Sequence, residues 1–401
     1  MVSTITSYTD SRYRAYTGEG LDGVVRVSVA GFYGTGVLLY DGQAVLTAAH
    51  LLVNNTTASV FFETSAGAQT ITSNRLTVHP YYDNTQSNND LAILWLSSPA
   101  PVTAERYTLY RESDEFFKTL TMVGYGLPGT GATGEVTDYS GSPIRLKANN
   151  QFEVDAATLK YALGSGMGWT PTAGTQLVAD FDNGTTSQDA LGQLLNLKGT
   201  GLGQNEGLIA AGDSGGPAFI NGQVAGIASY IASLENGSSH PDIDNVTNSS
   251  FGEIGAWQRV SYYQQWIDQS VRDHYPNAPT QPSQVQKSVI EGDSGTTYAY
   301  FLLQFTGMRS DPNQRLSVDY STRDGSAQAG QDYLAVSGTL VLYPGENEAV
   351  IPVEIRGDTL PESNEDFYLD VTNPVGGSFG VGVLTLTAMR TIVNDDGSLL
   401  V

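Results

Sequence analysis

The sequence predicts an all-β protein built from two domains in series. Short apolar segments alternate with turn residues through most of the chain, which is typical of barrels and sandwiches. The segment 276–283 is rich in proline and polar residues and has the composition of a linker. A chain of 401 residues is also longer than one ordinary domain. We therefore expect one domain over residues 1–275 and another over residues 284–401.

The apolar segments of the first domain predict a β-barrel or sandwich followed by a helix. Asp41-Gly42 is a turn signal between two of the segments. Tyr263, Trp266, Ile267 and Val271 recur on one helical face, and this helix should end near Pro276. The predicted strands are Val24–Val29, Gly36–Tyr40, Ala44–Ala48, Ala58–Phe62, Leu91–Leu96, Gln223–Ser229 and Trp257–Val260.

Residues 127–205 form a glycine-rich passage that we expect to carry loops around a substrate cleft. Within it, residues 176–184 resemble a strand that ends in an acidic turn containing Asp180 and Asp182. We expect these carboxylates to be solvated, and calcium binding is the alternative.

The second domain carries a further series of strands with even spacing. Such a series predicts a β-sandwich. The predicted strands are Tyr298–Phe305, Leu316–Tyr320, Gly338–Tyr343, Ala349–Ile355 and Phe367–Val371.

The composition excludes some classes of function. The formal net charge is −23, so a nucleic-acid-binding surface is not expected, because phosphate contacts need clustered Lys and Arg. No apolar run is long enough for a transmembrane helix, and no signal peptide is visible at the start of the chain. The chain has no cysteine, so its stability depends on packing and on any bound metal.

The segment from Gly212 to Pro217, with Ser214 at its centre, carries the strongest chemical signal. A serine hydroxyl becomes a nucleophile when a base takes its proton and donors receive the negative charge that forms. Glycines let the backbone turn tightly, so the N–H groups of Gly212 and Ser214 can point to one oxyanion. A glycine-rich hairpin turn is the alternative for a shorter match.

Two upstream residues complete a catalytic set. His50 ends the apolar run Leu46-Thr47-Ala48-Ala49, and a histidine of the core is the alternative. Asp90 directly precedes the apolar run 91–96, where a buried carboxylate would need a partner such as an imidazole N–H. The chain order His50, Asp90, Ser214 is that of chymotrypsin and differs from the orders of subtilisin and α/β-hydrolases.

These three motifs resemble those of trypsin-like serine proteases, over roughly residues 13 to 275. The resemblance implies a double β-barrel with a C-terminal helix and a triad in which His50 is the base, Asp90 orients it and Ser214 attacks. It also implies an oxyanion hole formed by Gly212 and Ser214, and no cofactor for catalysis.

The resemblance also suggests the residues of the substrate pocket. Leu208 stands where enzymes that select Arg or Lys carry an aspartate. Ser229 lies on the substrate-binding strand, Ile231 on one pocket wall and Gly255 on the opposite wall. A pocket with an apolar floor and a narrowed entrance should accept small or medium apolar P1 side chains.

Activation by trimming of the N-terminus is a further expectation from the family. A freed α-amino group would pair with Asp213 and order the oxyanion loop. Arg12 and Arg14 lie near the place where the new terminus should arise, so residues 1–14 are a possible leader. A disordered leader without such a role is the alternative.

Acidic residues of the second domain lie at the ends of predicted strands. Folding brings such charges together, and calcium takes six to eight oxygen ligands from loops of this kind. The segments 289–295, 324–333, 357–367 and 392–396 resemble a Calx-β domain, which is an immunoglobulin-like sandwich with calcium between loops at one end. The implied ligands are Glu291, Asp324, Asp358, Glu362, Glu365, Asp395 and Asp396. Asp332 is a further candidate, which a turn before Tyr333 explains equally well. Solvated turns in a spacer module, as in some bacterial proteins, are the alternative.

The sequence thus predicts a serine endopeptidase with a calcium-binding Calx-β module. Its partners should be protein or peptide substrates, with no nucleic acid and no membrane insertion, and it should be a secreted or cell-surface monomer. An inactive protease fold used for binding or adhesion is the main alternative. A lipase or esterase is a weaker one, because the G-x-S-x-G spacing is absent.

Overall fold

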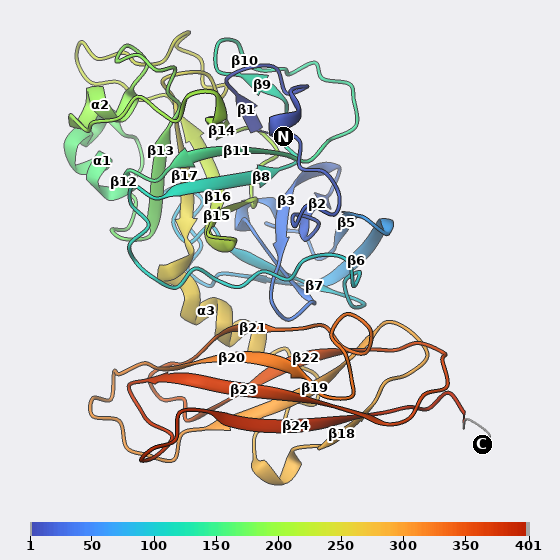
Figure 1. The fold of residues 1–401 in the computed structure, drawn as a ribbon. Coiled ribbons are helices and arrows are strands. Elements are labelled where there is room, and N and C mark those ends of the chain that lie inside the picture. The colour runs from blue at the N-terminus through green and yellow to red at the C-terminus, as the bar shows by residue number, and fades with distance from the viewer. Residues whose placement is uncertain (1, 398–401) are drawn as a thin grey trace. The chain divides into compact units, whose positions relative to one another are not determined.

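The computed structural model describes residues 2–397, which divide into two compact units. Of the described residues, unit 1 comprises 2–39 and 43–264, and unit 2 comprises 40–42 and 265–397. Both units consist mainly of β-strands (Figure 1). The predicted all-β class is therefore confirmed.

The first half of unit 1 is a closed β-barrel with the strand order β2-β3-β4-β7-β6-β5. Its interior is filled by the alternate, inward-facing residues of these strands, among them Val27, Leu38, Val60 and Leu94. The bounds are β2 (Val24–Val29), β3 (Phe32–Leu38), β4 (Ala44–Thr47), β5 (Ala58–Thr64), β6 (Gly67–Val78) and β7 (Ala92–Leu96), with the 3-10 turn η2 (Ala49–Leu51) after β4. The strand β6 was not predicted, because most of its side chains are polar and exposed.

The second half of unit 1 is built on a seven-stranded sheet of order β11-β8-β15-β16-β17-β13-β12. Its core contains Trp257, Phe152 and Leu208, all fully buried. The bounds are β8 (Thr119–Gly124), β11 (Leu146–Gln151), β12 (Val154–Asp155), β13 (Gln176–Asp180), β15 (Pro217–Ile220), β16 (Gln223–Ala232) and β17 (Ile254–Arg259).

A smaller sheet of order β10-β9-β1-β14 completes unit 1. Its strands are β1 (Val2–Thr4), β9 (Gly129–Thr130), β10 (Gly134–Glu135) and β14 (Gly207–Ile209). The helical segments are η1 (Ser11–Tyr13), α1 (Ala156–Leu163), η3 (Gly164–Gly166), α2 (Ala190–Leu195), η4 (Gly203–Asn205) and α3 (Val260–Arg272), the last of which begins in unit 1. The predicted C-terminal helix is thus present as α3.

Unit 2 contains a sandwich with a five-stranded sheet, β18-β24-β23-β20-β21, and a two-stranded sheet, β19-β22. Its core consists mainly of Leu, Val, Ile and Ala side chains, and within it the rings of Tyr333 and Phe367 stack at 4.6 Å. The bounds are η5 (Pro282–Gln284), β18 (Ser288–Ile290), β19 (Thr296–Gln304), β20 (Leu316–Asp324), β21 (Ser337–Leu342), β22 (Glu348–Arg356), β23 (Glu365–Val375) and β24 (Leu386–Val393). Among residues 2–397, no helix has the length and apolar character needed to cross a membrane.

Candidate active site and acidic clusters

The edge of the first barrel brings His50 and Asp90 together. The antiparallel pair β4 and β7 has Thr47 opposite Ala92, so the residues just after β4 and just before β7 meet at the same edge. His50 lies in η2, and Asp90 follows Asn89, whose left-handed backbone (φ 56°) reverses the chain there. This local geometry directs both side chains to one place.

Asp90 is 2% exposed and accepts three hydrogen bonds. Its Oδ2 lies 2.7 Å from His50 Nδ1, and its Oδ1 accepts from the His50 backbone N–H at 2.8 Å. The Ser229 hydroxyl donates to Oδ2 at 2.6 Å. Donors from the chain therefore compensate for the burial of this carboxylate.

Ser229 lies where β16 carries an irregularity opposite β17. It was expected only as a residue of the substrate-binding strand, and its contact with Asp90 was not foreseen. Ser229 and Asp90 are 139 positions apart, so a single sequence gives no local signal of their contact.

The loop around Ser214 packs on the segment that leads into His50. A Cβ atom at Gly215 would lie 2.1 Å from Thr47 Oγ1 and 2.8 Å from Ala48 N, so no larger residue fits there. The Thr35 N–H also donates to the Ser214 carbonyl at 2.8 Å. The loop around Ser214 is thereby held against the first barrel.

Two glycines of this loop have a backbone conformation that other residues rarely adopt. Gly212 and Gly215 have φ values of 93° and 82°, a region that favours glycine. Within the described part of the chain, the N–H groups of Gly212 and Ser214 have no backbone acceptor. Both N–H groups therefore remain able to bind a substrate oxygen.

Asp213 is buried beside Ser214 in the sequence and holds two backbone segments. Its carboxylate accepts from the N–H groups of Gly126 at 2.8 Å and of Ala210 at 2.9 Å. Burial raises its pKa to about 6, and the hydrogen bond from Ala210 only partly opposes this rise. The α-amino group of residue 1 lies outside the described residues, and pairing of a freed terminus with Asp213 stays a prediction.

The segment expected as a possible leader is part of the folded unit from residue 2 onward. The buried strand β1 pairs with β14, with Val2 opposite Ile209. The Arg12 guanidinium donates to the Gln204 side-chain oxygen at 2.6 Å, and the backbones of Arg14 and Leu146 form an isolated antiparallel β-bridge. A cut at Arg12 or Arg14 would therefore sever the covalent link between β1 and the rest of its unit.

Of the residues expected to form the substrate pocket, Ile231 and Gly255 lie on adjacent strands, and Leu208 lies on β14 of the smaller sheet. Ile231 pairs with Gly255 across β16 and β17. A Cβ atom at Gly255 would lie 2.9 Å from the Leu208 Cδ1 atom, so the Leu208 side chain lies against this glycine. Leu208 itself is fully buried.

Two groups of carboxylates form in unit 2, and in each the oxygens lie within 4.8 Å of one another. The first group is Glu291, Asp395 and Asp396, and the second is Asp332, Glu362 and Glu365. Burial raises the pKa of Glu291 to about 7, with the charge of Asp358 as the next cause. Burial likewise raises the pKa of Glu365 to about 7.

Asp324 is not brought into either group. Its carboxylate accepts from the Ala329 N–H at 2.9 Å and from the Tyr333 hydroxyl, and the Tyr333 bond lowers its pKa. Asp332, which a turn could equally explain in the sequence, lies in the second group instead. The difference arises because Asp324 ends β20 beside a turn that supplies its own donors.

The comparisons with known proteins agree with these two units. The Trypsin family model matches residues 13–158, and the Calx-beta domain model matches residues 283–396. The chain therefore carries a trypsin-like domain, which is followed by a C-terminal Calx-β domain, as predicted.

The curated relatives share only part of their length with this chain. Human sodium/calcium exchanger 2 is 28% identical over 201 residues, which cover 43% of this chain and 20% of the exchanger. The zebrafish (Danio rerio) adhesion G-protein coupled receptor V1 is 40% identical over 89 residues, which cover 22% of this chain and 1% of the receptor. Among solved structures, mouse neuropsin, a serine protease, matches with a TM-score of 0.46 and 17% identity, over 65% of this chain and 98% of neuropsin.

Proposed function

We propose that this chain is a serine endopeptidase that cleaves peptide bonds with His50, Asp90 and Ser214. The observation that carries the proposal is the triple hydrogen bonding of Asp90, which ties it to both the ring and the backbone of His50. A carboxylate on Nδ1 fixes the imidazole tautomer, so Nε2 is left to accept a proton. All three residue types of the triad are present in the chain.

The reaction follows from these roles. The Ser214 Oγ bonds to the peptide carbonyl carbon while its proton passes to His50 Nε2, and the N–H groups of Gly212 and Ser214 receive the oxyanion. The C–N bond then breaks, and the same proton goes to the leaving amine. A water molecule, activated by His50, hydrolyses the acyl-enzyme and restores Ser214.

We also propose a preference for small or medium apolar P1 side chains. Leu208 supplies no charge to attract Arg or Lys, and it lies against Gly255. Ile231 opposite Gly255 narrows the space further. Hydrolysis of Ala, Val or Leu peptides in preference to Arg or Lys peptides is the expected result, and the reverse preference would contradict it.

The Calx-β domain is proposed to bind Ca²⁺ through the carboxylates at one end of its sandwich. The residues present suit this ion, because all the donors are oxygens and the buried Glu291 Oε1 has no hydrogen-bond partner. Glu291, Asp395 and Asp396 would hold one ion, with Asp358 nearby, and Asp332, Glu362 and Glu365 another. We further propose that the protein acts as a secreted or cell-surface monomer on protein or peptide substrates.

Hydrolysis of labelled casein by the parent and by Ser214→Ala tests the catalytic proposal. The variant should lose about 10⁶-fold in turnover, as removal of a serine nucleophile does elsewhere. Ser140→Ala, in which an exposed serine is changed, is the matched control and should keep full activity. Absence of hydrolysis by a folded parent would favour the binding or adhesion protein instead.

A further inference from the structure

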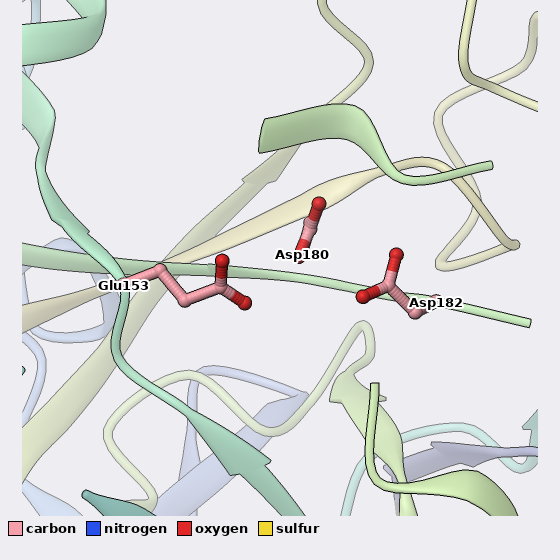
Figure 2. Close-up of side chains that lie close together, drawn as sticks. All are labelled: Glu153, Asp180 and Asp182. Atoms are coloured by element: carbon pink, nitrogen blue, oxygen red, sulfur yellow. The ribbon is translucent and has the colours of Figure 1, made fainter. Parts of the chain in front are cut away.

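Unit 1 contains a third group of carboxylates, separate from the catalytic residues. Glu153, Asp180 and Asp182 come from two chain segments, and their carboxyl groups gather at one place (Figure 2). One oxygen from each lies within 4.8 Å of the others. The expectation that Asp180 and Asp182 are solvated is therefore wrong, because these residues are only 1% and 2% exposed.

The fold explains why the three side chains converge. Asp180 ends β13, and Asp182 follows two positions later, where its carboxyl group reaches the same place as that of Asp180 (Figure 2). Glu153 lies on the neighbouring segment, where its N–H donates to the Val178 carbonyl at 2.9 Å. Strand pairing thus brings together carboxylates that are far apart in sequence.

The chain supplies too few donors for these buried oxygens. Asp180 Oδ2 accepts from the Leu191 N–H at 2.7 Å, but Asp180 Oδ1 and Asp182 Oδ1 are buried with no hydrogen-bond partner. Within residues 2–397, no Lys, Arg or His forms an ion pair with any of the three carboxylates. A buried carboxylate without donors or a cation is costly.

Neighbouring groups add negative charge instead of relieving it. The Glu206 carboxylate lies beside the cluster, since it accepts from the Asp182 backbone N–H at 2.7 Å. Burial raises the pKa of Glu153, Asp180 and Asp182, and the charge of Asp180 raises the pKa of the other two further. The surroundings therefore disfavour the ionised form of all three carboxyl groups unless a cation binds between them.

We propose that Glu153, Asp180 and Asp182 bind a Ca²⁺ ion within the protease domain, at a site independent of the Calx-β clusters. The donors are all carboxylate oxygens, and their separation permits each to lie 2.3–2.6 Å from a common ion, which is the range for Ca²⁺. The unpaired oxygens of Asp180 and Asp182 become ligands, and water completes the coordination.

The ion would stiffen the wall of the proposed substrate pocket. Asp180 pairs with Ile254 and Ala179 with Gly255, so a ligand at the end of β13 holds the start of β17. The Phe181 N–H also donates to the Glu253 carbonyl at 2.9 Å. Calcium at this site should therefore order residues 180–192 together with residues 252–256.

Hydrogen exchange of the full chain, measured with Ca²⁺ and with a chelator, tests the site. The protein carries Ser214→Ala so that self-cleavage cannot interfere. Ca²⁺ should slow exchange in the peptide covering residues 180–192 by at least about tenfold, and loss of the ligand in Asp182→Asn should abolish this effect at the same Ca²⁺ concentration. Asp138→Asn removes one exposed charge outside the cluster and should behave as the parent.

The same experiment separates this site from the Calx-β clusters and from catalysis. Peptides from residues 286–294 and 392–396 report on the Calx-β domain and should respond equally in all variants, while casein hydrolysis is measured apart. Calcium-independent exchange in residues 180–192 of the parent, or an unchanged calcium response in Asp182→Asn, would overturn the proposal.

A second variant guards against misfolding. Glu153→Gln keeps the shape of the side chain but removes an ionisable group, so in chelator it should unfold at a higher temperature than the parent. The slowing of hydrogen exchange in residues 180–192 by added Ca²⁺ should be at least about tenfold smaller than in the parent. A lower unfolding temperature in chelator would indicate that Glu153 instead shares a proton with Asp180, and this would overturn the cation site.

Discussion

Asp90 and Asp182 are equally buried aspartates of the same unit, each 2% exposed, but their surroundings differ completely. Asp90 accepts hydrogen bonds from two residues of the chain at 2.6–2.8 Å, whereas Asp182 Oδ1 has no partner. Burial alone therefore does not define the role of a carboxylate. A carboxylate that the chain satisfies can orient a neighbouring group, while one left without donors requires a ligand from outside.

The largest expected effect concerns the satisfied member of this pair. In Asp90→Asn the amide cannot hold the His50 ring in the same tautomer, so kcat/KM for an apolar peptide substrate should fall about 10⁴-fold. Asp138→Asn, which lies outside the site, should leave kcat/KM unchanged. A fall of less than tenfold in Asp90→Asn would show that Asp90 does not orient the base.

Asp213 is a third buried aspartate of this unit, and burial raises its pKa from 3.8 to about 6. The folded state binds this proton more tightly than the unfolded state, so the stabilisation is complete below pH 4 and is lost as the pH rises through 6. The shift corresponds to about 3 kcal/mol of the free energy of unfolding.

Thermal unfolding between pH 4 and 8, at constant calcium, measures this contribution. Asp213→Asn should lose this part of the pH dependence. The variant should also be less stable than the parent at every pH, because the new amide N–H group would face a backbone N–H donor. Equal pH dependence in parent and variant would contradict the assignment to Asp213.

The Calx-β domain repeats the pattern of Asp182, because Glu291 is buried with an unpaired oxygen. Calcium at a hundredfold excess over its Kd should stabilise the folded domain by about 2.7 kcal/mol. Glu291→Gln should reduce this gain, whereas Asp324→Asn should not, since Asp324 has donors of its own. Calorimetry of the two variants with calcium and with a chelator distinguishes them, and an equal loss of the gain in both would return Asp324 to the ligand set.

Ser229 tests how much of the function of Asp90 depends on its third donor. Ser229→Ala removes a hydrogen bond to a charged group, which is worth about 1.5–3 kcal/mol, so kcat should fall about tenfold to a hundredfold. KM should change little, because the hydroxyl is engaged with Asp90. A change confined to KM would instead assign Ser229 to substrate binding.

The sequence predicted the fold class, both domains and the approximate position of most strands, because these depend on local alternation and on motifs. It did not predict the polar strand β6, since exposed residues such as Gln69 and Asn74 give no apolar pattern. The cluster at Glu153 and the contact from Ser229 to Asp90 were missed for a different reason. Both depend on strand pairing between distant segments, which a single sequence does not reveal.

The smallest expected effect is also the most direct test of the comparison between Asp90 and Asp182. Replacement of aspartate by asparagine should lower the stability of unit 1 at position 90 and raise it at position 182. In chelator, Asp90→Asn loses charge-assisted hydrogen bonds and should lower the unfolding temperature of unit 1. Asp182→Asn removes a buried carboxyl group whose ionisation is opposed by burial and by the neighbouring carboxylates, and it should raise the free energy of unfolding by about 1 kcal/mol.

Thermal unfolding of the full chain with Ser214→Ala in both variants provides the measurement. Addition of calcium should reverse the order for Asp182→Asn, since the parent then gains a ligand-bound state that the variant lacks. Destabilisation by both substitutions in chelator would mean that Asp182 has donors of its own in solution, and the distinction between the two aspartates would then fail.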